Sequence, residues 1–280
     1  MKICRLLLLF WLAAVSAAAQ DLSLKPVTDS LSRPVSMPKV RVRTIALGSG
    51  QILDTYLSPE KYNGLSLRYT VSEERAFKRH RQLSQRFTHE GSFEHLRNRA
   101  DNNTETGGRY FFRYGLLWHK PLFDERFRVY GGGEAEAEVG FLYNMRNQNN
   151  PAQARLAMRL AAVVGAGYRF TWRHDKTCVL GYEAAIPLAG LMFSPYYGQS
   201  YYEIFNRGNY HHNAVPTSFV NAPSFRHQLT FDFPVSRLIL RVGYRGDFRQ
   251  AKVNGLRYHD YSHALVIGVV SRFSVTRLSL

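Results

Sequence analysis

The chain has 280 residues, a formal net charge of +16 at pH 7 and 14% aromatic residues, most of them Tyr and Phe. Its two cysteines exclude a disulfide framework, and no segment after the leader is apolar over the roughly 20 residues that a transmembrane helix needs. The positive charge favours anionic lipid head groups, lipopolysaccharide phosphates or acidic glycans as partners.

The start of the chain has the three parts of a secretory signal peptide. Lys2 and Arg5 supply positive charge, residues 6–15 form a short apolar run, and residues 17–19 are alanines. This order predicts residues 1–19 as a cleaved signal peptide. Because an exported protein does not meet nucleic acid in its compartment, we exclude nucleic acid as a partner.

Residues 20–38 are polar with three prolines, which predicts an extended periplasmic lead before a barrel domain at 39–280. From there apolar and polar residues alternate with a period of two. One face of the segment 109–119 carries Tyr110, Phe112, Tyr114, Leu116 and Trp118. The pattern predicts ten strands: 40–47, 63–72, 84–95, 108–120, 127–144, 154–173, 178–193, 224–233, 237–250 and 260–275.

Several of these runs exceed the five or six residues usual for strands in soluble domains. Long strands with this repeat, in even number, are typical of outer-membrane barrels. We therefore expect an all-β fold, an antiparallel up-and-down transmembrane β-barrel of about ten strands with a charged lumen. Its expected location is the outer membrane of a Gram-negative bacterium, as a monomer.

The predicted connections alternate between short and long, as periplasmic turns and extracellular loops do. The short ones are 121–126, 174–177 and 234–236, and the long ones are 48–62, 97–107, 145–153, 195–223 and 251–259. The connection 73–83 breaks the rule because it is long and basic on the periplasmic side. Either it forms a small helix or the first strands are misplaced.

Aromatic residues mark both ends of the predicted strands, as the two interfacial belts of a membrane protein do. Beside the short turns are Trp118, Trp172, Phe231 and Phe233. Beside the long loops are Tyr110, Tyr143, Tyr258 and Tyr261.

The inward face carries acidic residues that suggest either a catalytic carboxylate pair or an ionic network filling the lumen. We favour the network, because buried charges require partners and opposite charges on facing strands stabilise a sheet. Its expected members are Arg109, Arg113, Glu134, Glu136, Glu138, Arg159, Arg169 and Glu183. The expected pairs are Arg113–Glu134, Arg109–Glu138, Arg159–Glu138 and Arg169–Glu183.

The longest loop, 195–223, is rich in aromatic residues that suit stacking on glycans or docking to a protein. Alternatively these residues fold over the barrel mouth and bury one another. The candidate ligand contacts are Tyr196, Tyr197, Tyr201, Tyr202 and Tyr210. His211 and His212 are adjacent and point apart in an extended chain, so we predict no metal site and no cofactor.

An alternative function is an outer-membrane hydrolase, a protease or an enzyme acting on lipid A or phospholipid. Its candidate catalytic residues are Asp260 and His263 at a strand end and Asp247 on the neighbouring rim. We favour the alternative that they are polar residues at a solvated strand end. The leading interpretation is a non-enzymatic barrel that is structural or binds a ligand or partner through its loops. A third alternative is a soluble periplasmic β-barrel that binds a ligand.

The stretch from Gly48 to Gly64 contains Leu-Asp-Thr-Tyr-Leu-Ser-Pro at residues 53–59, followed by Tyr-Asn-Gly at 62–64. It resembles the opening motif of an uncharacterised secreted or outer-membrane domain family of unknown function from Bacteroidota. The resemblance implies a β-barrel over most of the mature chain, and it supplies no activity and no catalytic residues.

Overall fold

The structure, a computed structural model, describes residues 37–123, 126–148, 150–172 and 176–275. The predicted signal peptide and residues 20–36 of the predicted lead lie outside the described residues. Residues 37 and 38, the last two of that lead, belong to the first strand.

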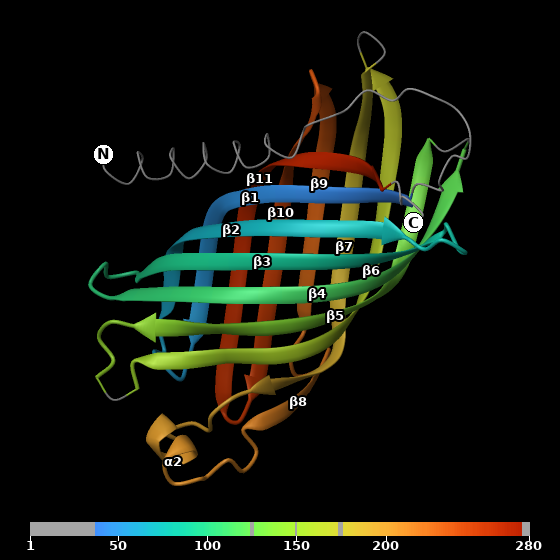
Figure 1. Cartoon of the computed structure of the whole chain (residues 1–280). Coiled ribbons are helices and arrows are strands. Elements are labelled where there is room, and N and C mark those ends of the chain that lie inside the picture. The colour runs from blue at the N-terminus through green and yellow to red at the C-terminus, as the bar shows by residue number, and fades with distance from the viewer. Residues whose placement is uncertain (1–36, 124–125, 149, 173–175, 276–280) are drawn as a thin grey trace. The chain divides into compact units, whose positions relative to one another are not determined.

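Ten long strands form one closed antiparallel β-barrel, as the sequence predicts (Figure 1). The strands are β1 (Met37–Asp54), β2 (Lys61–Ala76), β3 (Leu83–Asn98), β4 (Thr104–Leu122), β5 (Phe127–Asn144), β6 (Ala152–Trp172), β7 (Lys176–Phe193), β8 (Ala214–Ser218), β9 (Ser224–Val235), β10 (Leu238–Val253) and β11 (Leu256–Val275). Each long strand pairs with its neighbours in the chain, β7 pairs with β9, and β1 pairs with β11 to close the ring. The short β8 adds only to the end of β7.

The alternation along each strand sorts its side chains between lumen and exterior. On β4, Arg109, Phe111 and Arg113 are buried in the lumen, whereas Tyr110 and Leu116 are exposed on the outside. Successive side chains of a strand point to opposite faces, so the sequence pattern sets these faces directly. The helix α2 (Tyr201–Phe205) lies between β7 and β8, and no helix in the described ranges is long and apolar enough to cross a membrane.

The exceptional connection at 73–83 is shorter than predicted, because the strands extend into it from both sides. β2 continues to Ala76 and β3 resumes at Leu83, so only residues 77–82 connect them and no helix forms. Glu73 holds the charged segment in the sheet, because its carboxylate forms ion pairs with Lys39 at 2.6 Å and with Arg41 at 2.5 Å, both on β1. The predicted small helix was wrong, and the end of the second strand was misplaced by four residues, from 72 to 76.

Most of the predicted long loops are also wrong. The predicted loops 48–62, 97–107 and 251–259 are connections of only 55–60, 99–103 and 254–255, because the strands extend into them. Outward apolar alternation stops there, but inward side chains such as Ile52 and Leu96 are still buried. Strand pairing therefore continues past the point where the sequence pattern fades. We call this the loop end and the opposite end, which has the other hairpin turns, the turn end.

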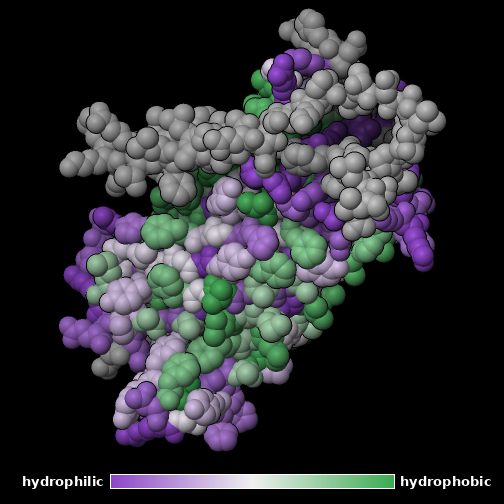
Figure 2. All heavy atoms as spheres, in the orientation of Figure 1, coloured by the Kyte–Doolittle hydropathy of each residue, from purple (hydrophilic) through white to green (hydrophobic). Residues whose placement is uncertain are grey.

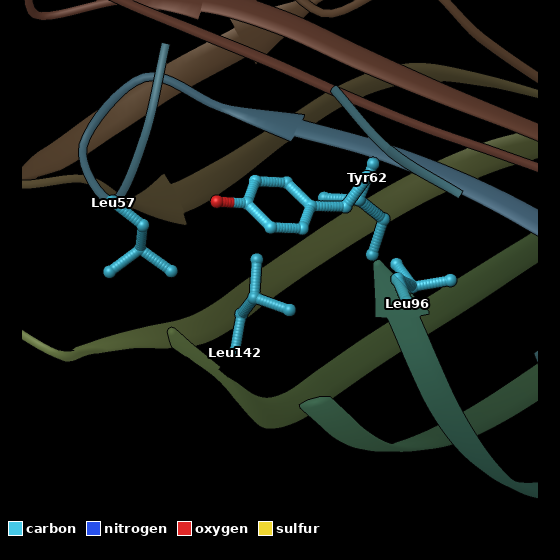
Figure 3. Packing of buried hydrophobic residues seen from close by; sticks show 5 residues of the cluster. Leu57, Tyr62, Leu96 and Leu142 are labelled. Carbon is cyan, nitrogen blue, oxygen red and sulfur yellow. The ribbon is translucent and has the colours of Figure 1, made fainter. Parts of the chain in front are cut away.

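An apolar cluster fills the lumen at the loop end. Its members are Ile52, Leu57, Tyr62, Leu96 and Leu142, from β1, β2, β3, β5 and the first loop. Figure 3 shows the Tyr62 ring between Leu57, Leu142 and Leu96. The Tyr62 hydroxyl accepts hydrogen bonds from the side-chain amides of Asn103 and Asn144, at 2.7 and 3.1 Å. This joins the cluster to the Asn-rich connections above it.

The outer wall is largely apolar. Leu116, Val139 and Leu160 are 43%, 52% and 62% exposed on it, and Phe112 is partly exposed. Figure 2 shows hydrophobic side chains over the visible wall of the barrel and hydrophilic ones gathered towards its ends.

Aromatic residues gather at both ends of this wall. At the turn end Trp172 contacts Phe231, which stacks on Phe233 with ring centroids 5.5 Å apart. At the loop end Tyr143 is 42% exposed. Tyr258 does not belong to the outer belt, because it points into the lumen, where its hydroxyl accepts a hydrogen bond from Arg109 at 3.1 Å. The alternation along β11 places it on the same face as the buried Asp260.

The turn between β10 and β11 depends on backbone conformation. Asn254 and Gly255 both have positive φ, 51° and 75°, as a two-residue type I′ hairpin requires. We expect Gly255→Ala to lower the free energy of unfolding by about 1–2 kcal/mol, measured by denaturant titration of the refolded protein. Gly91→Ala is the control, since a Cβ there meets nothing within 4 Å. Equal losses in the two variants would contradict this explanation.

Candidate functional site

The middle of the lumen is filled by an ion-pair network, which we call the plug. Within the described residues it contains nine arginines and nine carboxylates, each within 4.0 Å of an oppositely charged partner. The members are Arg68, Arg86, Arg109, Arg113, Arg155, Arg159, Arg226, Arg245, Arg249, Asp54, Glu90, Glu94, Glu134, Glu136, Glu138, Glu183, Asp247 and Asp260. Their formal charges cancel, 9 − 9 = 0.

Glu90 on β3 forms one centre of the plug. Arg68, Arg113 and Arg245 contact it at 3.2, 3.0 and 2.6 Å. These arginines come from β2, β4 and β10, so one carboxylate ties together opposite walls of the barrel. The Glu90 side chain is fully buried. A buried charge of this kind is stable only with its partners in place.

The acidic column of β5 forms the second centre. Glu136 accepts from Arg113 at 2.6 Å and from Arg159 at 2.9 Å, and Glu138 accepts from Arg159 at 2.7 Å and from Arg249 at 3.2 Å. The expected contact between Arg159 and Glu138 is therefore present.

The expected pairing of β4 with β5 was wrong by two residues. Arg113 lies opposite Glu136 rather than Glu134, and Arg109 lies opposite Gly140 rather than Glu138. Arg109 stays 3.9 Å from Glu138 but binds Glu94 at 2.5 Å. A shift of two residues leaves each side chain on the same face, so network membership survives the error.

The expected pair Arg169–Glu183 was also wrong. Glu183 lies opposite Gly165, and Arg169 lies opposite Val179, a shift of four residues. Glu183 instead accepts from Arg86 and, at 2.8 Å, from the Tyr130 hydroxyl. Arg169 takes no part in the plug.

The sequence prediction missed much of the plug, including Arg68, Glu90, Glu94, Arg226, Arg245 and Arg249. A signal for several of them was present in two triplets with a spacing of two, Glu90-Ser92-Glu94 and Arg245-Asp247-Arg249. The other partners come from strands with no such charge pattern.

One aromatic ring lies inside the plug. Phe111 is fully buried, and the guanidinium carbons of Arg249 and Arg113 lie 4.2 and 5.1 Å from its ring centre. Cations over an aromatic face are attracted by its quadrupole, so the Phe111 ring stabilises the two guanidinium groups without an additional carboxylate. Every acid of the plug is committed to arginines, an arrangement that fills space rather than transfers protons.

The three candidate catalytic residues do not converge. Asp260 and Asp247 are buried in the plug, where Asp260 pairs with Arg109 and Asp247 with Arg249 at 3.0 Å. His263 is on the outer face, where it hydrogen-bonds the Tyr244 hydroxyl. The alternation of β11 separates Asp260 from His263, so the proposed constellation at the outer rim was wrong.

The candidate tyrosines of the long loop divide into two kinds. Tyr201 on α2 is partly buried, donates to the Gln153 side chain at 3.0 Å and stacks on Phe205, and burial raises its pKa. The other four are exposed on the loop: Tyr196, Tyr197, Tyr202 and Tyr210, at 41%, 75%, 59% and 61%. Tyr201 thus anchors the loop, and the other four form a surface.

A capping box fixes the start of α2. The Ser200 backbone N–H and hydroxyl donate to the Glu203 carboxylate at 2.7 and 3.1 Å, and these bonds lower the pKa of Glu203. His212, with a φ of 61°, follows His211 in the same loop. Among the described residues no group of three or more His, Cys, Asp or Glu side chains is placed to hold a metal ion.

Glu90→Gln tests the plug directly. Removing this charge leaves three buried arginines undercompensated, so we expect a loss of about 3–5 kcal/mol in the free energy of unfolding, measured by urea titration of the refolded protein. The double variant Glu90→Gln/Arg245→Gln should lose less than the two single variants added together. Glu60→Gln, at an exposed position, is the control with a small effect, and additive losses in the double variant would refute the coupling.

Three solved structures that resemble the chain are outer-membrane barrels. The outer membrane protease OmpT from Escherichia coli is 7% identical, the match covers 88% of this chain and 100% of that chain, and the TM-score is 0.45. For the COG4313 outer membrane channel from Pseudomonas putida F1 the identity is 10%, the coverage is 90% of this chain and 100% of that chain, and the TM-score is 0.42. For the translocator domain of autotransporter NalP from Neisseria meningitidis the identity is 12%, the coverage is 92% of this chain and 96% of that chain, and the TM-score is 0.37. Likenesses this low assign no activity. No curated protein matches the chain.

The resemblance to an uncharacterised family is tested by a family model that spans nearly the whole chain. The model described as "Protein of unknown function (DUF3316)" matches residues 1–279. The chain therefore belongs to this family of unknown function.

Proposed function

We propose that the protein is a monomeric, non-conducting barrel of the Gram-negative outer membrane that binds a ligand or partner through its loop end. The observation that carries this proposal is the combination of an apolar outer wall with a lumen closed by a neutral, buried plug. An apolar exterior suits lipid, and a plugged interior leaves the loops as the surface for recognition.

The outer wall supports the membrane location over a soluble periplasmic barrel. Soluble monomers rarely expose apolar patches larger than a few hundred Å², whereas this wall is apolar on many neighbouring strands. Six large apolar side chains on it have exposed fractions of 55–70%: Met158, Leu160, Val164, Leu188, Leu265 and Ile267. In water this surface would drive aggregation, and in lipid it is the ordinary exterior of a barrel.

Two layers in the lumen support the non-conducting state. The apolar cluster around Tyr62 closes the loop end, and the plug fills the middle with side chains of which Arg68, Glu90 and Glu94 are at most 1% exposed. A conducting pore needs a continuous polar channel, and both layers interrupt it.

The closed ring supports the monomeric state. It has no free edge strand, which removes the usual route to association through sheet edges.

The exposed residues of the loop end suit partners that are anionic or that contact aromatic rings. Its exposed cations are Lys61, Arg97, Arg99, Arg146, Arg207, Lys252 and Arg257, and only one of them, Arg97, has an ion pair among the described residues, with Asp101. Lipopolysaccharide phosphates match this charge. The exposed Tyr197, Tyr202 and Tyr210 suit stacking on a glycan or contact with a protein. A hydrolase is disfavoured, because Asp260 and His263 lie on opposite faces of β11.

Cell fractionation and conductance test the proposal together. The protein should co-fractionate with outer membranes, run with heat-modifiable mobility on gels, and give no stable conductance steps in planar bilayers. Recovery in the soluble periplasmic fraction, or steady single-channel conductance from the wild type, would overturn it.

A matched pair of substitutions tests the lipid-facing wall. Val164 is 59% exposed on β6 and Val220 is 91% exposed in the long loop. We expect Val164→Arg to cost about 2–4 kcal/mol of folding free energy in lipid vesicles, the range for a cation on the lipid face of a barrel. Val220→Arg should change it little. Two equal values would show that lipid does not cover β6.

A further inference from the structure

The turn-end half of the lumen is a cavity. Its volume is about 510 Å³, within the range of sites for small molecules. The plug forms its floor through Glu90, Arg113 and Arg245, and its walls run to the turn end at Arg126 and Arg272. A molecule in it could not pass onward to the loop end, because the plug and the apolar cluster block the way.

The charges that line this cavity do not cancel. Nine arginines and five carboxylates line it, an excess of 9 − 5 = +4. All five carboxylates already have a basic partner: Glu90, Glu134 and Glu183 in the plug, Glu74 with His119 at 3.0 Å, and Asp232 with Arg241 at 2.7 Å.

Four arginines of the lining are left over. Arg126, Arg128, Arg169 and Arg272 have no ion pair with any carboxylate in the described ranges. Arg128 on β5 lies opposite Gly167, two residues from Arg169 on β6, and the Arg169 backbone N–H donates to the Arg126 carbonyl at 2.6 Å. Three of the four thus lie side by side on one wall.

Arg272 faces this group from β11. Arg169, Arg128 and Arg241 are near enough to repel it, and Asp232, which already pairs with Arg241, is near enough to attract it. Like charges held around one cavity destabilise the empty protein and attract anions. Guanidinium groups also match the oxygen spacing of phosphate and carboxylate with two parallel hydrogen bonds.

We propose that this cavity binds a soluble, multivalent anion bearing phosphate or carboxylate groups. Multivalence follows from four arginines that share one space and have no ion pair among the described residues, and small size follows from the cavity volume. The wall around the cavity is a closed ring of paired strands, so it offers no lateral path for the acyl chains of a lipid. The site itself does not rest on the proposed membrane location, which determines only that the anion would enter from the periplasm.

Calorimetric titration of the refolded full-length protein tests the site, with pyrophosphate and citrate as probes. We expect saturable binding of at least one probe to one site, with an affinity that falls steeply as salt is added. Preference for pyrophosphate identifies a phosphate site, and preference for citrate identifies a carboxylate site. Failure of both probes to bind at low ionic strength would overturn the proposal, whatever the membrane location.

A pair of double variants locates the binding. Arg128→Gln/Arg169→Gln should weaken the binding by about tenfold or more, the factor that 1.4 kcal/mol represents. Arg79→Gln/Arg81→Gln removes the same charge from exposed positions in the connection 77–82, outside the cavity lining, and should leave binding unchanged. Heat-modifiable mobility confirms that both variants are folded. Equal losses in the two variants would show that the anion responds only to net charge and would refute the site.

Stability without ligand separates a binding role from a structural one. Because Arg128 and Arg169 repel their neighbours, Arg128→Gln/Arg169→Gln should unfold at the same urea concentration as the wild type or a higher one. A lower unfolding midpoint without anion would mean that the arginines stabilise the fold, and would contradict the proposal.

Discussion

The pairing of arginines with carboxylates inside the barrel is the constraint on which the rest of the structure depends. Ten strands enclose a lumen that must be filled, and here it is filled with charge. A buried charge is tolerated only when its partners are placed around it. Glu90, Glu136 and Asp247 each contact arginines from more than one strand, so the plug also specifies which strands face each other across the lumen.

The plug divides the lumen into three regions with different physical properties. Towards the loop end an apolar cluster around Tyr62 and Leu96 excludes water. In the middle the charges cancel. Towards the turn end the cancellation fails, and arginines with no ion pair in the described part of the chain surround a cavity. The same residue type therefore fills space in one region and offers an anion site in another, and the supply of carboxylates decides which.

The outer wall and the loops differ from the lumen, and from each other, in the side chains that they expose. The wall is largely apolar, whereas the loop end carries cations and exposed tyrosines beyond the last apolar positions. Tyr201 packs into the base of the long loop, and its neighbours Tyr197 and Tyr202 project from it. The loop is thus held in one place by a few buried contacts and leaves most of its aromatic surface accessible.

The sequence by itself determined the fold class, the ten strands and, where the alternation is clear, the face on which charged residues lie, because a period of two assigns faces without reference to the rest of the chain. It placed Arg113 and Glu136 in the lumen even though the predicted register was wrong by two residues. It could not set that register, since a pattern with a period of two is unchanged by such a shift. Only the tertiary structure brought Glu90 to Arg245, 155 residues apart, and left Arg169 without Glu183. Contacts across the lumen depend on every turn and on ring closure together, and no local pattern contains that information.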